Sequence, residues 1–502
     1  MVLIPVHENL SPALPRSSSR VLFNSIDFAL FLPIVLLLYW KVFGGDLRTQ
    51  NAFLLAASMV FYGWWDWRFL GLVFLSSVID WSVGISLDRT EAPTRRKWLL
   101  AASMLANLGI LGVFKYYDFF ITNFNEAFTL MGLPIGIRTL DVVLPVGISF
   151  YTFQTMSYSI DVYRRQIEAT RDPIAFSAYV LFFPQLVAGP IERASSLMPQ
   201  FKRERAFVIA DAWDGLRQIL WGLFKKVLVA DTCAKYVDQI YSAPELMSGS
   251  TLALGTALFA FQIYGDFSGY SDIAIGTARL FGFNLMRNFA YPYFSRDMAE
   301  FWRRWHISLS TWFRDYVYIP LGGSRGGKFF QVRNAMIIFV VSGFWHGASW
   351  NFLIWGFLNG LYFLPLILAE RNRHNLGIVA EGNLLPSLRE AGGMLSTFLL
   401  ACMAWVFFRA NDLPDALSVY EGIFSKSLFT VPDHLFSKDL KVVFLSLGVL
   451  LTLEWVARGR QYGLQLDGIA PRWVRRTIYY GVVALIIAYA PITTASFIYF
   501  QF

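Results

Sequence analysis

Apolar runs of membrane-spanning length recur along almost the whole chain, and short gaps between them hold most of the lysines and arginines. Backbone polar groups in lipid must be satisfied within their own segment, so such runs fold as helices. The chain has 502 residues, of which 56% are hydrophobic and only 16% are charged. Soluble globular proteins carry about 25% charged residues. The sequence therefore predicts an all-α polytopic membrane protein.

Crossing a bilayer core takes about 20 helical residues. Several of the apolar runs are too short or too polar to be simple spans, so we expect a bundle of roughly ten to thirteen membrane helices with re-entrant segments. No internal repeat or soluble domain is visible, which favours a single domain over residues 1–502. The candidate spans lie near 24–42, 51–65, 67–86, 98–116, 142–160, 174–190, 212–230, 250–264, 334–349, 351–369, 394–409, 441–456 and 477–498.

The distribution of basic residues predicts the orientation. Arg89, Arg95, Arg96 and Lys97 follow the third span, and loops rich in lysine and arginine stay in the cytoplasm. Counting from this loop places both termini outside, including the polar segment 1–20, and suits a bacterial cytoplasmic membrane. The formal net charge of +8 is then explained by topology and by contact with membrane lipid rather than by nucleic-acid binding.

The run 174–190 breaks this alternation. Basic residues lie on both sides of it, and both of these flanks are expected to be cytoplasmic. A re-entrant hairpin fits, since Pro184, Gly189 and Pro190 would interrupt its helix. The alternative is a tilted ordinary span with a short compensating helix nearby.

His306 lies within the segment 300–323, EFWRRWHISLSTWFRDYVYIPLGG. Helical spacing predicts one amphipathic helix at the cytoplasmic interface, with His306 at the margin of its aromatic face. A purely anchoring helix with a boundary histidine stays an open alternative. The aromatic face comprises Trp302, Trp305, Leu309, Trp312 and Tyr316, and the opposite face comprises Arg304, Thr311 and Asp315.

His346 lies inside the apolar run 339–360, FVVSGFWHGASWNFLIWGFLNG. An ionisable group within a membrane segment is costly and indicates function by default. The small neighbours Gly343 and Gly347 leave room for a substrate or for a close helix. Histidine suits general-base work near neutral pH. The alternative is a core histidine that bonds to another helix.

Two further segments carry polar residues in apolar surroundings. Asp266 and Asp272 are expected to pair with Arg279 or Arg287 for structural reasons rather than to act in catalysis. The segment 149–165 predicts hydrogen bonds between helices first and cavity lining second, through Ser149, Gln154, Tyr158 and Asp161.

Other chemistries find no support in the sequence. Cys233 and Cys402 form no C-x-x-C pair, and the five histidines have no metal-ligand spacing, so we expect no metal. Neither a G-x-S-x-G elbow nor a P-loop occurs. The glycine-rich run 322–327, GGSRGG, reads as a flexible turn.

Taken together, these segments resemble the membrane-bound O-acyltransferase family, and most closely its bacterial alginate O-acetylation branch. The resemblance runs over most of the chain, from VLFNSIDFALFLPIVLLLYW through LFFPQLVAGPIER, YGDFSGYSDIAIGTARLFGFN and the two histidine segments. It implies a helical bundle around a central funnel or tunnel, with His346 as the membrane histidine of the family and His306 as its second, cytoplasm-side histidine.

The resemblance also implies a function. An acyl thioester on the cytoplasmic side, here acetyl-CoA, would donate an acetyl group that crosses to an extracytoplasmic partner of the SGNH type for O-acetylation of a polysaccharide such as alginate. His346 would accept the acceptor's proton, and Trp345, Ser342, Ser349 and Asn351 are candidate oxyanion donors. Arg303, Arg304 and Arg314 would receive the phosphates of coenzyme A.

Two alternatives remain at this point. D-alanyl transfer from a carrier protein to teichoic acid uses related chemistry, whereas a non-enzymatic transporter belongs to another class. The arginines near His306 favour coenzyme A over a carrier protein, and the absence of matching halves in the sequence argues against a transporter. Nothing in the sequence specifies which polysaccharide is the acceptor.

Overall fold

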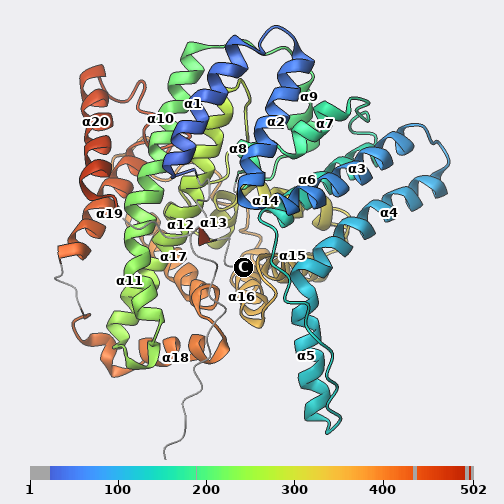
Figure 1. Cartoon of the computed structure of the whole chain (residues 1–502). Coiled ribbons are helices and arrows are strands. Elements are labelled where there is room, and N and C mark those ends of the chain that lie inside the picture. The colour runs from blue at the N-terminus through green and yellow to red at the C-terminus, as the bar shows by residue number, and fades with distance from the viewer. Residues whose placement is uncertain (1–22, 188, 434–437, 492–496, 499–502) are drawn as a thin grey trace, which may run out of the picture.

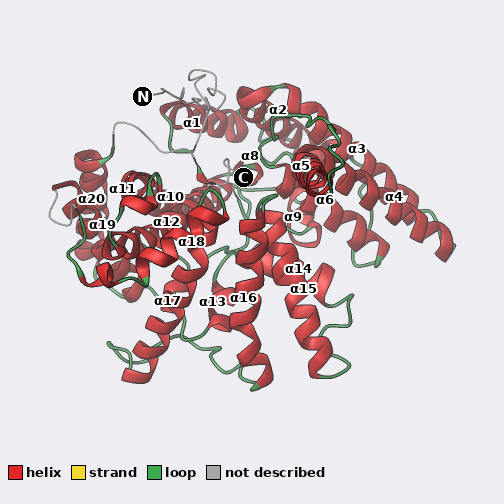
Figure 2. Ribbon diagram, turned by 90° about the horizontal axis from the view of Figure 1, so that it is seen from below, coloured by secondary structure: helices red, strands yellow, loops and turns green. Residues whose placement is uncertain are grey.

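The computed structural model describes residues 23–187, 189–433, 438–491 and 497–498 (Figure 1). Every regular element in these ranges is a helix (Figure 2), which confirms the predicted all-α class. The polar segment 1–20, with the extracytoplasmic placement expected for it, lies outside the described residues, as do His7 and His434.

The first half of the chain forms helices that follow the predicted spans closely. They are α1 (Ile26–Lys41), α2 (Leu47–Asp66), α3 (Arg68–Asp88), α4 (Pro93–Leu111), the π-helix η1 (Gly112–Tyr116), α5 (Tyr117–Leu130), α6 (Ile148–Tyr163), α7 (Pro173–Val180), α8 (Phe183–Leu186), α9 (Ala194–Phe201), α10 (Ile209–Leu223), the π-helix η2 (Phe224–Ala230) and α11 (Asp231–Tyr241).

The second half holds the longest helix and the elements around the two histidines. Its elements are η3 (Pro244–Leu246), α12 (Gly249–Leu280), η4 (Pro292–Phe294), α13 (Met298–Arg304), α14 (Ile307–Phe313), the π-helix η5 (Arg314–Tyr318), α15 (Lys328–His346), α16 (Trp350–Leu368), α17 (Leu388–Arg409), α18 (Leu413–Ile423), η6 (Lys426–Phe429), α19 (Lys438–Val456) and α20 (Arg472–Tyr489).

Within the described part of the chain, four helical segments are both long enough and apolar enough to cross a bilayer on their own. These are Arg68–Asp88, Pro93–Leu130, Trp350–Leu368 and Leu388–Arg409. The other helices are shorter or carry more polar residues, and α12 buries its polar residues against its neighbours. Several helices begin at a side chain that accepts a bond from the first turn, namely Ser25, Asp46, Ser248 and Ser349.

The central helix α12 is surrounded by α10, α11 and α17 (Figure 1). Glycine pairs let α10 and α12 approach backbone to backbone. A Cβ added to Gly222 would lie 2.5 Å from the main-chain oxygen of Gly269, and one added to Gly269 would lie 2.8 Å from that of Gly222. Small residues at a helix contact are the usual means of such close packing in membranes.

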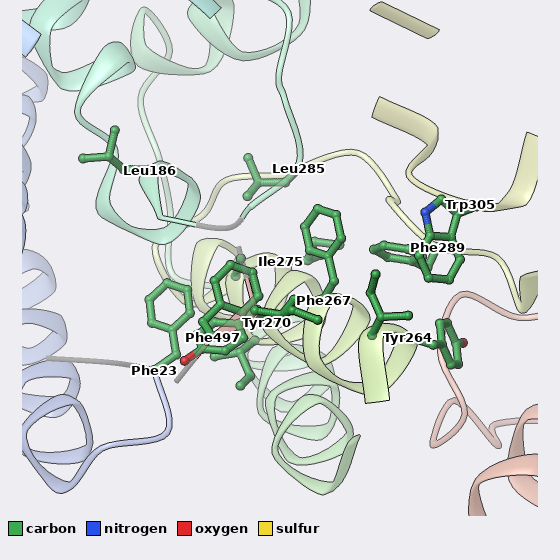
Figure 3. Packing of buried hydrophobic residues seen from close by; sticks show 14 of the residues in the cluster. Phe23, Leu186, Tyr264, Phe267, Tyr270, Ile275, Leu285, Phe289, Trp305 and Phe497 are labelled. Atoms are coloured by element: carbon green, nitrogen blue, oxygen red, sulfur yellow. The ribbon is translucent and has the colours of Figure 1, made fainter. Parts of the chain in front are cut away.

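Aromatic side chains fill the core on the other side of α12 (Figure 3). Phe267 and Tyr270 extend from α12 toward Phe289, Trp305 and Phe497, with Tyr270 and Phe497 ring centroids 4.3 Å apart and those of Phe289 and Trp305 5.1 Å apart. Aromatic pairs at these distances add stabilisation beyond their buried area.

The aspartates of α12 pair within the core, but with other partners than the sequence suggested. Lys225 Nζ lies 2.5 Å from Asp272, and Lys226 Nζ lies 2.7 Å from Asp266 and 2.8 Å from Asp231. Both lysines belong to the π-helix η2. The expected pairing with Arg279 or Arg287 is therefore wrong, although the expected structural role fits, and Arg279 instead pairs with Asp214.

The segment 174–190 forms two short helices, α7 and α8, neither of which is long enough to cross a bilayer. Both are buried, as irregular backbone at membrane depth must be. Two short helices in place of one continuous helix agree with the expected re-entrant segment. The polar residues of α6 form hydrogen bonds between helices, as expected. The Gln154 side chain donates to the main-chain oxygen of Tyr179 (2.8 Å), and the Asp161 carboxylate accepts from the Tyr316 hydroxyl (2.8 Å).

Candidate active site

A cavity of about 540 Å³ opens among α13, α14, α15 and the loop 372–376, and both His306 and His346 line it. Their imidazole centroids lie 6.5 Å apart, and both side chains are buried. The cavity wall is otherwise mostly apolar, with Trp302, Phe339 and Phe363 among its residues. A concave, largely apolar site with a few convergent polar groups is the usual form of a ligand pocket.

His306 occupies a break in the chain, and the single amphipathic helix predicted for residues 300–323 is wrong. Helix α13 ends at Arg304 and α14 begins at Ile307, while His306 adopts a left-handed conformation with φ 43° and ψ 55°. The Ile307 amide donates to the main-chain oxygen of Asn288 (2.9 Å), which ties the break to the preceding loop. The chain around the break is buried, and His306 is 1% exposed.

The neighbours of His306 fix its tautomer. Its Nδ1 lies 3.1 Å from Asn288 Oδ1, which also accepts from the Ser308 hydroxyl at 2.8 Å. The Asn288 amide nitrogen donates to Ser271 Oγ (3.1 Å), so the oxygen assignment is consistent. Nδ1 therefore carries the proton, and Nε2 presents a lone pair. Nε2 has no hydrogen-bond partner among the described residues.

His346 is the last residue of α15, where the chain turns into α16. Gly343 and Gly356 lie at the crossing of these two helices, and a Cβ on either would overlap a main-chain oxygen of the other helix. The close crossing holds the end of α15 against α16. There the His346 ring meets Trp355 edge-on with centroids 5.0 Å apart.

The π-helix η1 caps the end of α15. Lys115 Nζ donates to the main-chain oxygens of Trp345 (2.8 Å) and His346 (3.0 Å), and the Tyr116 hydroxyl donates to that of Phe344 (3.2 Å). These are among the carbonyls that a helix leaves without an internal partner at its C-terminus. A cation there also complements the helix dipole.

A second, smaller cavity of about 40 Å³ lies on the Lys115 side of His346. Lys115, Ser149, Phe150 and Trp345 line it together with the segment 144–148. Among the described residues, His346 is the only one that lines both this cavity and the larger one. His346 therefore lies between the two cavities.

The arginines expected to receive the donor divide into two groups. Arg303 and Arg314 line the large cavity, and Arg303 is held by bonds to the main-chain oxygens of Asn372 (2.7 Å) and Asn375 (2.8 Å). Arg304 does not line it, because its guanidinium pairs with the buried Glu300 at 2.8 Å. Arg373 joins the cavity wall from the loop after α16.

The four candidate oxyanion donors also differ in position. Ser342 lines the large cavity and Trp345 lines the small one. The indole Nε1 of Trp345 has no hydrogen-bond partner among the described residues. Ser349 instead caps α16 at the Phe352 amide, and Asn351 donates to the Ala410 oxygen (2.9 Å).

Several residues of the site were not singled out by the sequence. Asn288 lies in an extended loop without helical or strand periodicity, so no pattern indicated its contact with His306. Lys115 sits in an apolar run, and its charge was the one signal that could have identified it. Arg373 follows the apolar run of α16, and no motif in the sequence distinguishes it from the arginines around it.

Comparison with known proteins gives a consistent result. The model of the membrane-bound O-acyltransferase family matches residues 165–375, which include both histidines. A probable alginate O-acetylase of Pseudomonas aeruginosa is 40% identical over 404 residues, covering 80% of this chain and 74% of that protein. A peptidoglycan O-acetyltransferase of Helicobacter pylori is 34% identical over 80% of each chain. A teichoic acid D-alanyltransferase of Streptococcus thermophilus is 31% identical over 53% of this chain and 69% of that protein.

Proposed function

The chain belongs to the membrane-bound O-acyltransferase family as a multi-pass membrane acyltransferase, and we propose that it passes acetyl groups from a cytoplasmic thioester to an extracytoplasmic acceptor for O-acetylation of a polysaccharide. The observation that carries this proposal is the position of His346 between two cavities. O-acetylation is also the activity named for relatives that align over most of their length.

The reaction is an acyl transfer from sulfur to oxygen. His346 accepts the proton of the acceptor hydroxyl while the hydroxyl oxygen attacks the thioester carbonyl carbon. The C–S bond then breaks, the proton passes to the leaving thiolate, and an oxygen ester and a free thiol result. The Trp345 indole N–H and the Ser342 hydroxyl, which line the small and the large cavity, are the proposed neutral donors for the developing oxyanion.

The large cavity is proposed to receive acetyl-CoA. Arg303, Arg314 and Arg373 lie on its wall, and guanidinium groups suit phosphate and pyrophosphate. Its apolar part would accommodate the pantetheine arm, with the thioester between His306 and His346. His306 Nε2 would accept a hydrogen bond from the donor or from a water in the cavity.

The same arginines support a cytoplasmic opening for this cavity in the bacterial cytoplasmic membrane. Asp315, next to Arg314, pairs with Arg193 and accepts from Arg164 at its main-chain oxygen (3.2 Å). Arg165 in turn pairs with Glu91 in the basic loop after α3. These contacts bring basic loops together near the cavity, and loops rich in arginine and lysine favour the cytoplasmic side. Both termini would then face outward.

The small cavity supports an intermediary acceptor. Its volume of about 40 Å³ matches one or two water molecules and would not admit a polymer chain. A slender hydroxyl-bearing group could reach His346 there and hand the acetyl group to a partner of the SGNH type outside the membrane, which would complete transfer to the polysaccharide.

The experiment is complementation of cells that lack the native gene. Acetate released by mild base from the cell-surface polymer is compared for the wild type, His346→Ala and His374→Ala at matched membrane levels. His374 is exposed and lies outside the large cavity, so its variant controls for loss of a histidine. Restoration by the wild type and His374→Ala but not by His346→Ala is expected.

Two other outcomes contradict the proposal in different ways. Restoration by His346→Ala would remove this histidine from the reaction. Absence of polymer-bound acetate with the wild type, together with D-alanyl esters in the same base extract, would replace acetyl transfer by the activity named for the more distant relatives.

A further inference from the structure

A separate cavity of about 740 Å³ lies between α10 and the N-terminal half of α20, two neighbouring helices at one edge of the bundle (Figure 1). It shares no lining residue with either cavity at His346. The stripe Trp213, Leu216, Arg217 and Leu220 of α10 lines one wall. These residues recur every three or four positions and so share a helix face.

The cavity carries an excess of positive charge. Arg217, Arg472, Arg475 and Arg476 line it against a single aspartate, Asp467. Asp467 pairs with Arg217 at 2.6 Å and also with Arg475, so it joins the two walls. Four positive charges and one negative charge leave an excess of three at this opening.

Three arginines of α20 line this opening and retain unused hydrogen-bonding capacity. Arg472 and Arg476 are exposed and form no ion pair among the described residues. The Nε of Arg475 is buried and has no hydrogen-bond partner in the part of the chain that the structure describes. All three belong to the first turns of α20, where the helix dipole also favours an anion.

The rest of the cavity is apolar and aromatic. Trp213 is 60% exposed and Tyr480 is 72% exposed, and Leu216 lies between the aromatic and the basic residues of α10. Exposed tryptophan and tyrosine mark the level of the lipid headgroups in membrane proteins. A basic end next to an aromatic and aliphatic end matches an amphipathic ligand rather than a free ion.

We propose that this cavity binds one anionic phospholipid, with its phosphate at Arg472, Arg475 and Arg476 and the first methylenes of its acyl chains against Trp213, Leu216 and Tyr480. Basic pockets between membrane helices are suited to anionic headgroups. Guanidinium groups bond phosphate oxygens in a fixed, often two-pronged geometry. A bound lipid would join α10 to α20, two helices otherwise connected here through Asp467.

The test is native mass spectrometry of the delipidated full-length protein in detergent, titrated with phosphatidylglycerol or with phosphatidylcholine of the same acyl chains. The variant Arg472→Gln/Arg476→Gln removes two charges that no ion pair uses. The matched control Arg95→Gln/Lys97→Gln removes two exposed charges from the first turns of α4. We expect the first variant to weaken retention of one phosphatidylglycerol about tenfold and the control to leave it unchanged.

Three results of this titration would overturn the proposal. They are equal retention of phosphatidylglycerol by the wild type and the α20 variant, equal loss of it in both variants, and retention of phosphatidylcholine equal to that of phosphatidylglycerol.

A second experiment adds excess inorganic phosphate to the protein with bound lipid. Displacement of the lipid by phosphate alone would assign the arginines to a free anion, whereas persistence of the lipid supports the amphipathic site. Unchanged thermal unfolding of both variants would show that the comparison is made on folded protein.

Discussion

The ammonium of Lys115 donates to the main-chain oxygen of His346 at 3.0 Å, which joins the π-helix η1 to the end of the helix that carries the central histidine. The two residues belong to segments that are far apart in the sequence. This contact explains how a residue at a helix end, normally a place of fraying, holds its side chain in a defined position between two cavities. π-Helical turns recur at functional sites.

Replacement of Lys115 by methionine is expected to lower acetyl transfer about tenfold or more, since a hydrogen bond to a charged donor contributes about 1.5–3 kcal/mol. Lys115→Arg should recover part of the activity, because it restores a cation at the helix end. The measurement is base-released acetate at matched protein levels. Activity of Lys115→Met equal to the wild type would show that η1 does not position His346.

Replacement of the Asn288 side chain should lower acetyl transfer more than replacement of the Ser308 side chain. Asn288→Leu deletes the oxygen that orients Nδ1, whereas Ser308→Ala leaves that oxygen in place. We expect about a hundredfold loss of transfer for Asn288→Leu and less than about tenfold for Ser308→Ala. The reverse order of the two variants would contradict the tautomer assigned to His306.

Arg314→Gln/Arg373→Gln is expected to raise the KM for acetyl-CoA about tenfold with little change in kcat, because both side chains lie on the cavity wall and are proposed to bind the phosphates of the donor. Arg304→Gln serves as the comparison. It should lower stability instead, since it leaves the buried Glu300 with less compensation. Initial rates in inverted membrane vesicles distinguish the two effects, and an unchanged KM for the double variant would remove these arginines from donor binding.

Addition of one methyl group at the α15–α16 crossing should destabilise the protein. A Cβ at Gly343 overlaps the Phe352 oxygen, so Gly343→Ala is expected to cost about 1–3 kcal/mol. Gly109→Ala is the matched control within helix α4, where a Cβ would meet nothing within 4 Å, and it should be neutral or slightly stabilising. Thermal unfolding in detergent measures both, and equal midpoints for the two variants would exclude a tight crossing.

Lys226→Met should prevent stable folding, because it leaves the carboxylates of Asp231 and Asp266 without their cation in the core. Removal of one partner from a buried ion pair costs about 3–5 kcal/mol. The exposed pair Arg68–Asp66 offers the contrast, and Arg68→Gln should change stability by less than about 1 kcal/mol. Accumulation of Lys226→Met in the membrane at wild-type levels and with wild-type thermal stability would contradict the structural role of η2.

The sequence was sufficient to predict most helices, because apolar length is a local property that lipid makes decisive. It also singled out His346, because an ionisable side chain within an apolar run is costly; the structure places this residue at both cavities, and its catalytic role stays a prediction. The break at His306 was missed because the aromatic spacing of residues 300–323 satisfies a helix, whereas the tie between Ile307 and Asn288 is a tertiary contact.

The ion pairs of the core were misassigned for a related reason. The sequence analysis paired Asp266 and Asp272 with arginines close in sequence. Lys225 and Lys226 reach these aspartates from a π-helical turn, which no residue pattern predicts. Arg304 resembles its neighbour Arg303 in the sequence, and only the fold of α13 directs one toward Glu300 and the other toward the cavity.

The two cavities at His346 have a consequence for the energetics of the cell. A channel open at both ends would let protons and ions flow down their gradients, which a membrane that stores free energy as an ion gradient cannot tolerate. The His346 imidazole packs edge-on against Trp345, Trp355 and Phe408 between the two spaces. A constriction lined by such rings excludes water, so we expect the proposed position of acyl transfer to limit the leak of ions as well.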